Sequence, residues 1–181
     1  MDKAIVLIDA GYFSKVLNAL GRPNIDFAKF SDLLCQRANS ERLRTYYYDC
    51  LSYQGYKPTK DERNRYIAKR KFVSVLNRLP RFEVRLGRLS RSGDSFKQKG
   101  IDTLLSIDLT RLAWRGIIQK EILVSGDSDF APAIREAKLA GVIVQIYYLK
   151  SKFTSVHDEL FEVSDEQFEI SKELLSSVVR K

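Results

Sequence analysis

Cysteine and histidine are scarce in this sequence of 181 residues. It contains two cysteines, Cys35 and Cys50, and a single histidine, His157. No Cys-x-x-Cys pair occurs, which argues strongly against a Cys/His zinc site, and covalent Cys/His catalysis would have to use His157. Both cysteines lie in apolar segments, so we expect them to be reduced thiols in the core.

Several common catalytic motifs are also missing. There is no Gly-x-x-x-x-Gly-Lys-[Ser/Thr] loop, no Gly-x-Gly-x-x-Gly after the first strand-like segment, and no Gly-x-Ser-x-Gly turn. These absences argue against a P-loop nucleotide hydrolase, a dinucleotide-binding enzyme and a serine hydrolase of the α/β type. The first strand also lacks Asp-x-Asp-x-Thr, which argues against a phosphatase with an aspartyl nucleophile.

The N-terminus shows no leader pattern, because Met1-Asp2-Lys3 runs directly into a strand-like segment. No long apolar span follows anywhere in the chain. We therefore expect a cytoplasmic protein with no membrane partner.

The positive charge is concentrated in one stretch. The whole chain carries a formal net charge of +8. Between Lys57 and Arg91 there are twelve basic and three acidic residues, a balance of +9, whereas the rest of the chain sums to −1. A polyanion such as RNA is a natural partner for such a segment, although a solvated basic helix with no partner is an equally simple explanation.

Short apolar runs alternate with longer segments of helical periodicity. This alternation predicts an α/β domain with a mainly parallel five-stranded sheet between two layers of helices. If the strand order is 3-2-1-4-5, the first and fourth strands are neighbours, and ligands bind at their carboxyl ends. The five runs are Ala4–Ile8, Arg44–Tyr48, Phe82–Leu86, Glu121–Val124 and Val142–Tyr148.

We predict one domain over residues 1–170 and a helical tail over residues 171–181. The segment Val163–Lys181 has the pattern of a closing helix with an acidic face, and Ser90–Ser95 has the composition of a polar loop. Gly141 is a plausible stop for the helix that begins near Pro132.

Acidic residues stand where two of the predicted strands end. Asp9 follows the first strand directly, Asp127 and Asp129 follow the fourth, and Asp102 opens the helix before the fourth strand. Carboxylates gathered at one edge would repel each other unless a cation lay among them, and their hard oxygens suit Mg²⁺ or Mn²⁺. We therefore predict that Asp9, Asp102, Asp127 and Asp129 are metal-binding and catalytic residues. Each of them could instead cap a helix, and taken singly that is the commoner role.

Four stretches of this sequence, taken together, resemble the NYN domain family, in particular its LabA-like branch within the PIN-like nucleases. They are Ile8-Asp9-Ala10-Gly11-Tyr12-Phe13, Tyr46-Tyr47-Tyr48-Asp49, Lys99-Gly100-Ile101-Asp102 with Asp108-Leu109, and Ser125-Gly126-Asp127-Ser128-Asp129-Phe130 with Pro132 and Gly141.

The resemblance implies a PIN-like fold and a divalent-metal-dependent endoribonuclease whose metal-binding acids are Asp9, Asp102, Asp127 and Asp129. Asp108 matches a frequent family acid, but it lies six residues after Asp102, so the two would not share a helix face. Tyr12 stands where many members have Asn, and this departure favours an alternative, a catalytically inactive RNA-binding or regulatory module.

We expect the substrate to be single-stranded or structured RNA, and single-stranded DNA is an open alternative. A homodimer is an open possibility for the assembly. The basic segment would contact the phosphate backbone, and each neutralised phosphate steepens the salt dependence of binding. The residues predicted to contact nucleic acid are Lys99, Arg63, Arg65, Lys69, Arg70 and Tyr12.

Overall fold

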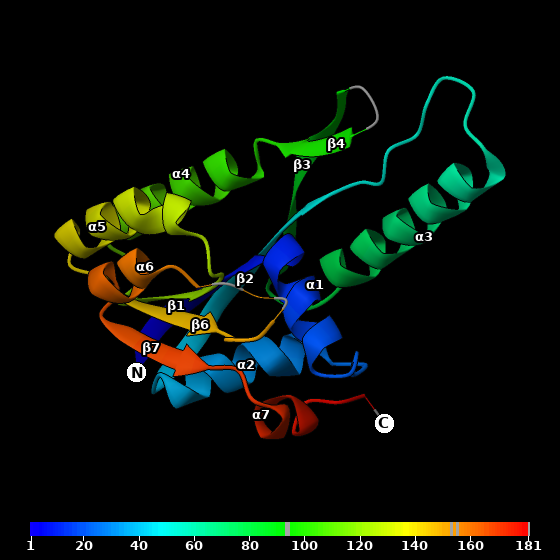
Figure 1. The fold of residues 1–181 in the computed structure, drawn as a ribbon. Helices are drawn as coiled ribbons and strands as arrows, with labels where there is room; N and C mark the ends of the chain where they lie inside the picture. Colours follow the sequence, from blue (N-terminus) through cyan, green and yellow to red (C-terminus); the bar gives the residue numbers. More distant parts are fainter. Residues whose placement is uncertain (93–94, 153, 155, 181) are drawn as a thin grey trace.

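The computed structural model describes residues 1–92, 95–152, 154 and 156–180, with the backbone alone described over residues 88–92 and 95–99. Strands and helices alternate along most of the chain (Figure 1). In order, they are β1 (Asp2–Asp9), α1 (Ala10–Ala19), α2 (Phe27–Arg37), β2 (Ser40–Cys50), α3 (Lys60–Asn77), β3 (Phe82–Ser92), β4 (Ser95–Lys99), α4 (Ile101–Ala113), β5 (Lys120–Val124), the short 3-10 helix η1 (Ser128–Phe130), α5 (Ala131–Leu139), β6 (Ile143–Tyr148), α6 (Asp158–Val163), β7 (Glu166–Glu169) and α7 (Lys172–Ser176).

The strands form one sheet in the order β4-β3-β2-β1-β5-β6-β7. All neighbouring pairs are parallel except β3 and β4, which are antiparallel. The predicted α/β class with a mainly parallel sheet is therefore confirmed, and the five predicted strands lie in the 3-2-1-4-5 order. Because β1 and β5 are direct neighbours, with Ile8 opposite Val124, their carboxyl ends meet at the point where the strand order reverses.

Strand β1 is apolar because both of its faces are covered. Ala4, Val6 and Ile8 pack into one hydrophobic cluster, and Ile5 and Leu7 pack into a second cluster on the opposite face. Side chains alternate between the two faces of a strand, so a strand in the middle layer must be apolar at every position. This burial fixes the register that brings Asp9 to the sheet edge.

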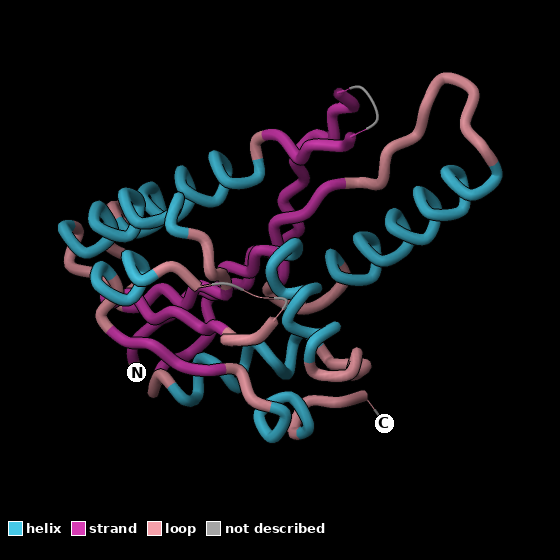
Figure 2. The backbone as a smooth tube through the Cα atoms, in the orientation of Figure 1, coloured by secondary structure: helices cyan, strands magenta, loops and turns pink. Residues whose placement is uncertain are grey.

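The two clusters correspond to two layers of helices (Figure 2). Helices α1, α2 and α7 cover one face, together with the C-terminal part of α3, and helices α4, α5 and α6 cover the other. Helix α5 ends at Leu139, and Gly141 follows with φ +83°, a left-handed conformation that glycine adopts without strain. The prediction that Gly141 stops this helix is confirmed. Cys35 and Cys50 are buried free thiols, also as predicted.

Two strands were not predicted. Strand β7 lies within Val163–Lys181, so the prediction of one continuous helix there is wrong. The segment Glu166–Glu169 has a single apolar residue, Phe168, because an edge strand with one covered face needs few apolar side chains. Residues 90–92 and 95 of the predicted polar loop belong to the hairpin of β3 and β4, whereas residues 93–94 lie outside the described residues.

Helix α3 projects from the body of the molecule (Figure 1). Its N-terminus is closed by a capping box in which Thr59 and Glu62 satisfy each other's backbone N–H groups. Of its eighteen residues only Val73 and Leu76 are buried, and both lie in the C-terminal third. Within the described ranges, no helix combines the length and apolarity that crossing a bilayer requires.

Candidate functional site

Asp9 ends β1 and caps α1. Its carboxylate accepts hydrogen bonds from the backbone N–H of Tyr12 at 3.2 Å and from the hydroxyl of Ser125 at 3.3 Å. The contact with Ser125 ties the end of β1 to the end of β5. Burial raises the pKa of the Asp9 carboxyl, and the charge of Asp102 raises it further, against the opposing effect of these hydrogen bonds.

Asp127 lies on the turn that follows β5. Its side chain caps η1 by accepting a hydrogen bond from the backbone N–H of Asp129 at 3.0 Å. Asp9 and Asp127 thus both act as caps, the role considered as the alternative to metal binding. Capping leaves much of a carboxylate free, because its two oxygens together offer about four lone-pair sites.

Asp102 stands in the first turn of α4 and is not a cap. The cap position is Gly100, whose φ of +84° turns the chain from β4 into the helix with no side-chain hydrogen bond. Burial raises the pKa of the Asp102 carboxyl, and the charges of Asp127 and Asp129 raise it further. These acids therefore act on one another through space, although they come from different elements.

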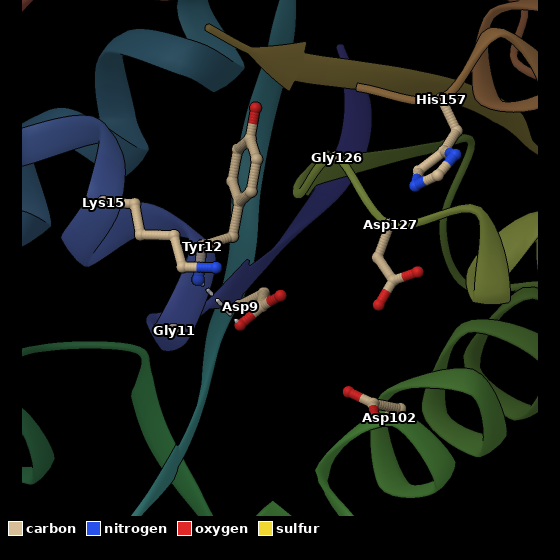
Figure 3. Close-up of a pocket in the computed structure, with 8 residues that line it drawn as sticks. All are labelled: Asp9, Gly11, Tyr12, Lys15, Asp102, Gly126, Asp127 and His157. Carbon is tan, nitrogen blue, oxygen red and sulfur yellow. Dashed lines mark hydrogen bonds between the residues drawn. The ribbon is translucent and has the colours of Figure 1, made fainter. Parts of the chain in front are cut away.

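Asp9, Asp102 and Asp127 line one cavity of about 390 Å³, which we call the acidic pocket (Figure 3). Gly11, Tyr12, Lys15, Gly126 and His157 complete its lining. Asp129 instead lines an adjoining cavity of about 610 Å³, and Asp102 contributes to both cavities. The structure thus brings three of the four predicted acids to one cavity and places the fourth, Asp129, in the adjoining cavity.

The chemistry of this donor set suits a hard divalent cation, since the three side chains offer carboxylate oxygens that repel each other. Over the part of the chain that the structure describes, no three Asp, Glu, His or Cys side chains already lie close enough to share an ion. Mg²⁺ commonly keeps several water ligands and binds through one or two carboxylates. A pocket with separated carboxylates is compatible with that mode.

Lys15 and His157 were not predicted as site residues. Figure 3 shows Lys15 on the same side as Asp9, and His157 on the opposite side beside Asp127. Lys15 lies four residues after Gly11 on α1, so helical spacing could have indicated it. His157 comes from the segment before α6, where its backbone N–H donates to the carbonyl of Gly126 at 3.4 Å. No local sequence signal points to that position.

A comparison with models of protein families matches the NYN domain over residues 3–171. This chain belongs to the NYN domain family. The family is one of PIN-like nucleases. Among solved structures, a protein of unknown function from Vibrio parahaemolyticus matches with a TM-score of 0.65 and 21% identity, covering 94% of this chain and 93% of that one. That likeness concerns the fold. A comparison with curated proteins gives no match.

Tyr12 lines the acidic pocket of this NYN domain with its ring, while its hydroxyl points away from the acids (Figure 3). The hydroxyl oxygen accepts a hydrogen bond from the backbone N–H of Leu149 at 3.0 Å. Only 9% of Tyr12 is exposed. The side chain thereby joins α1 to the end of β6.

The predicted RNA-contacting residues of the NYN domain differ in their surroundings. Arg63, Arg65 and Arg70 are exposed on α3. Lys69 instead forms an ion pair with the buried carboxylate of Asp49, with 2.5 Å between Nζ and Oδ2. The side chain of Lys99 lies outside the described side chains.

Asp108 is separated from the acidic pocket, as its spacing from Asp102 predicted. Its side chain is buried under α4, where it accepts a hydrogen bond from the hydroxyl of Tyr48 at 2.9 Å. Its carboxylate oxygens also lie 3.7 Å from Arg85 and 3.5 Å from Arg111. Asp108 therefore holds α4 against β2 and β3.

Proposed function

We propose that this NYN domain is a divalent-metal-dependent endoribonuclease that hydrolyses phosphodiester bonds of single-stranded or structured RNA. One observation carries the proposal: Asp9, Asp102 and Asp127, from three separate elements, line a single cavity at the carboxyl edge of the sheet. No lysine or arginine among the described side chains forms an ion pair with any of the three. Their negative charge is thus left for a cation to neutralise.

The three carboxylates would hold the cation, with Asp129 positioned to support it from the adjoining cavity. When bound, a divalent cation activates water and stabilises the charge that develops on phosphoryl oxygens. Lys15 and His157 lie on opposite sides of the pocket and would orient the phosphate by hydrogen bonds. Ser125 keeps the Asp9 carboxylate in place.

Arg63, Arg65 and Arg70 would hold the RNA backbone, since they are exposed on a helix that projects from the body of the molecule. A helix with few buried residues gains little from packing, which leaves its basic surface open to a polyanion. We include Lys99 and Tyr12 in this proposal, Lys99 because it lies three residues before Asp102 and Tyr12 because its ring lines the pocket.

The test is cleavage of end-labelled single-stranded RNA by the purified full chain, with Mg²⁺ or Mn²⁺ and then with EDTA. Asp127→Asn keeps the η1 cap because Asn is as good a cap as Asp, and we expect it to abolish cleavage. Asp2→Asn is the matched control, since Asp2 is exposed at the opposite end of β1. A single-stranded DNA of the same sequence, run in parallel, shows whether the 2′-hydroxyl is needed. Metal-independent cleavage, or full activity of Asp127→Asn, would overturn the proposal.

The alternative is a non-catalytic RNA-binding module, favoured by Tyr12 in place of Asn. Thermal unfolding with added Mn²⁺ separates the two functions. Binding at 100 times Kd stabilises a native protein by about 2.7 kcal/mol. We expect a rise in melting temperature for the natural sequence and Asp2→Asn, and a smaller rise for Asp127→Asn. No rise in any of them, together with salt-sensitive RNA binding, would favour the non-catalytic module.

A further inference from the structure

A second cavity lies at the other end of the sheet from the acidic pocket. It has a volume of about 380 Å³ and is lined by residues of β1, β2 and β3, by the end of α4 and by the segment after it. Ile5 lines this cavity and Asp9 lines the acidic pocket, four residues further along β1, a separation of about 13 Å in a strand. The two cavities share no lining residue.

Arginine dominates the polar lining of this cavity, which we call the arginine pocket. Arg44, Arg85, Arg111 and Arg115 all line it, against one acid, Glu83. The buried Asp108 lies behind it and contacts Arg85 and Arg111. Four guanidinium groups against these two carboxylates leave an excess of two positive charges. That excess complements a phosphate monoester, which carries about −1.5 to −2 near neutral pH.

Most of the hydrogen-bonding capacity of these arginines remains available. A guanidinium has five N–H donors. The ion pairs of Arg44 and Arg111 each involve one nitrogen, at 3.7 Å from Glu83 and 3.5 Å from Asp108. Arg115 takes part in no ion pair among the described side chains. Guanidinium groups with free N–H donors bind phosphate oxygens in bidentate fashion.

Arg85 is fixed in place before any ligand arrives. Its guanidinium carbon lies 5.3 Å from the ring centroid of Tyr46, and its Nε lies 3.0 Å from Glu83 and 3.7 Å from Asp108. An arginine held on one aromatic face and between two carboxylates loses little side-chain entropy on binding.

Apart from Tyr46, the remainder of the lining is aliphatic. Ile5, Leu43, Leu112, Ile117 and Ile118 all contribute to it. An inorganic anion gains nothing from such a surface, whereas a flat heterocycle joined to a phosphate would cover it. The volume falls in the range of small-molecule sites.

We propose that the arginine pocket binds a nucleoside phosphate, with the phosphate on Arg44 and Arg115 and the base against the aliphatic side chains. The same chemistry could come from a free mononucleotide or from the 5′-phosphorylated end of an RNA strand. The proposal does not rest on nuclease activity, because none of Asp9, Asp102 and Asp127 lines the arginine pocket.

The experiment measures binding of 5′-AMP to the full chain by calorimetry in EDTA, so that no cation can recruit phosphate to the acidic pocket. Adenosine and inorganic phosphate are measured alongside. We expect one site for AMP, and affinities for adenosine and phosphate at least about tenfold weaker, because each lacks one half of the interaction. Phosphate binding as tightly as AMP would overturn the nucleoside part of the proposal.

Arg44→Gln combined with Arg115→Gln should weaken AMP binding by about tenfold or more. Arg63→Gln with Arg65→Gln removes the same charge from α3 and should leave AMP affinity unchanged. Ile117→Glu, a change at a half-exposed position that keeps every arginine, should weaken AMP binding by charge repulsion. Equal AMP affinity in the natural sequence and in the variants of the arginine pocket, Arg44→Gln with Arg115→Gln and Ile117→Glu, would overturn the proposal.

Further binding measurements distinguish the possible sources of the ligand. A 5′-phosphorylated oligonucleotide that binds more tightly than AMP, and loses affinity in the pocket variants, identifies an RNA end. Equal affinity identifies the free mononucleotide. A glutamate-rich peptide that binds more tightly than both, and depends on Arg44 and Arg115, would replace the proposal with an acidic protein partner. Asp127→Asn should bind AMP normally, so a failed nuclease assay and a failed nucleotide assay are distinguishable.

Discussion

The hydroxyl of Tyr12, on α1, is hydrogen-bonded to the backbone of Leu149, the residue that follows β6. The oxygen of Tyr12 lies 3.0 Å from the nitrogen of Leu149 and 3.4 Å from its carbonyl oxygen. Both residues are buried. Residues 137 positions apart are thus joined beside the acidic pocket.

Tyr12→Phe should destabilise the fold without removing the acidic pocket. The change leaves the buried N–H of Leu149 without an acceptor, which costs about 1–3 kcal/mol. Urea unfolding followed by circular dichroism measures the loss. Because the hydroxyl points away from the acids, RNA cleavage below the unfolding transition should persist. An unchanged urea midpoint would show that this hydrogen bond contributes nothing to stability.

Asp108→Asn and Asp102→Asn should have opposite effects, although both residues are on α4. Asp108 is paired with Tyr48, Arg85 and Arg111, so its change should lower the free energy of unfolding by roughly 1–3 kcal/mol, given that the arginines are partly exposed. Asp102 is repelled by Asp127 and Asp129, so its change should leave the fold as stable or more stable while cleavage is lost. Thermal melts and RNA cleavage of the two variants are the measurements. A less stable Asp102→Asn would show that Asp102 has a structural role.

Lys69→Gln should affect stability, whereas Arg63→Gln and Arg65→Gln should affect RNA binding. Removing Lys69 leaves the buried carboxylate of Asp49 without its ion-pair partner, at a cost of roughly 1–3 kcal/mol. The exposed arginines can be replaced within about 0.5 kcal/mol. Each arginine that contacts a phosphate should reduce the slope of log affinity against log salt by about 0.7–0.9. Filter binding over a salt series, beside thermal melts, tests both statements, and an unchanged slope in the arginine variants would exclude these arginines from the RNA contact.

Glu121→Met should stabilise the protein more at alkaline than at acidic pH. Glu121 is fully buried, and neither carboxyl oxygen has a hydrogen-bond partner among the described residues. Burial raises the pKa of this carboxyl well above the ordinary value of 4.5, so the folded state holds the proton more tightly than the unfolded chain. The contribution of the protonated Glu121 to the free energy of unfolding is therefore fully present below pH 4.5. It is lost as the pH rises through the pKa of the folded state.

Methionine is similar in size to glutamate and carries no charge, so Glu121→Met does not lose stability as the pH rises through the pKa of Glu121. The melting temperature of Glu121→Met should exceed that of the natural sequence at about pH 8, with a smaller difference near pH 4.5. Glu41→Met, at an exposed position on β2, is the control for removing a carboxylate. A difference independent of pH would mean that Glu121 remains ionised in the folded protein.

Local sequence determined the five predicted strands and the stop of α5 at Gly141. The apolar runs beginning at Ala4 and Glu121 are each a consequence of burial on both faces of a central strand, and that burial is visible in composition. The acids that follow these strands could be located in advance, because a residue directly after a parallel strand must lie at the carboxyl edge. Edge strands such as β7 escaped prediction, since one exposed face removes the need for apolar residues.

Only the tertiary structure decided which charged groups meet. Asp102 lines the same pocket as Asp127 because α4 begins at that sheet edge, whereas Asp129, two residues beyond Asp127, lines the adjoining cavity. His157 and the four arginines of the second pocket come from segments with no common sequence pattern. Periodicity and capping act over a few neighbouring residues and can therefore be predicted from the chain. The meeting of distant side chains depends on strand order, register and helix position, which are set by packing of the whole domain.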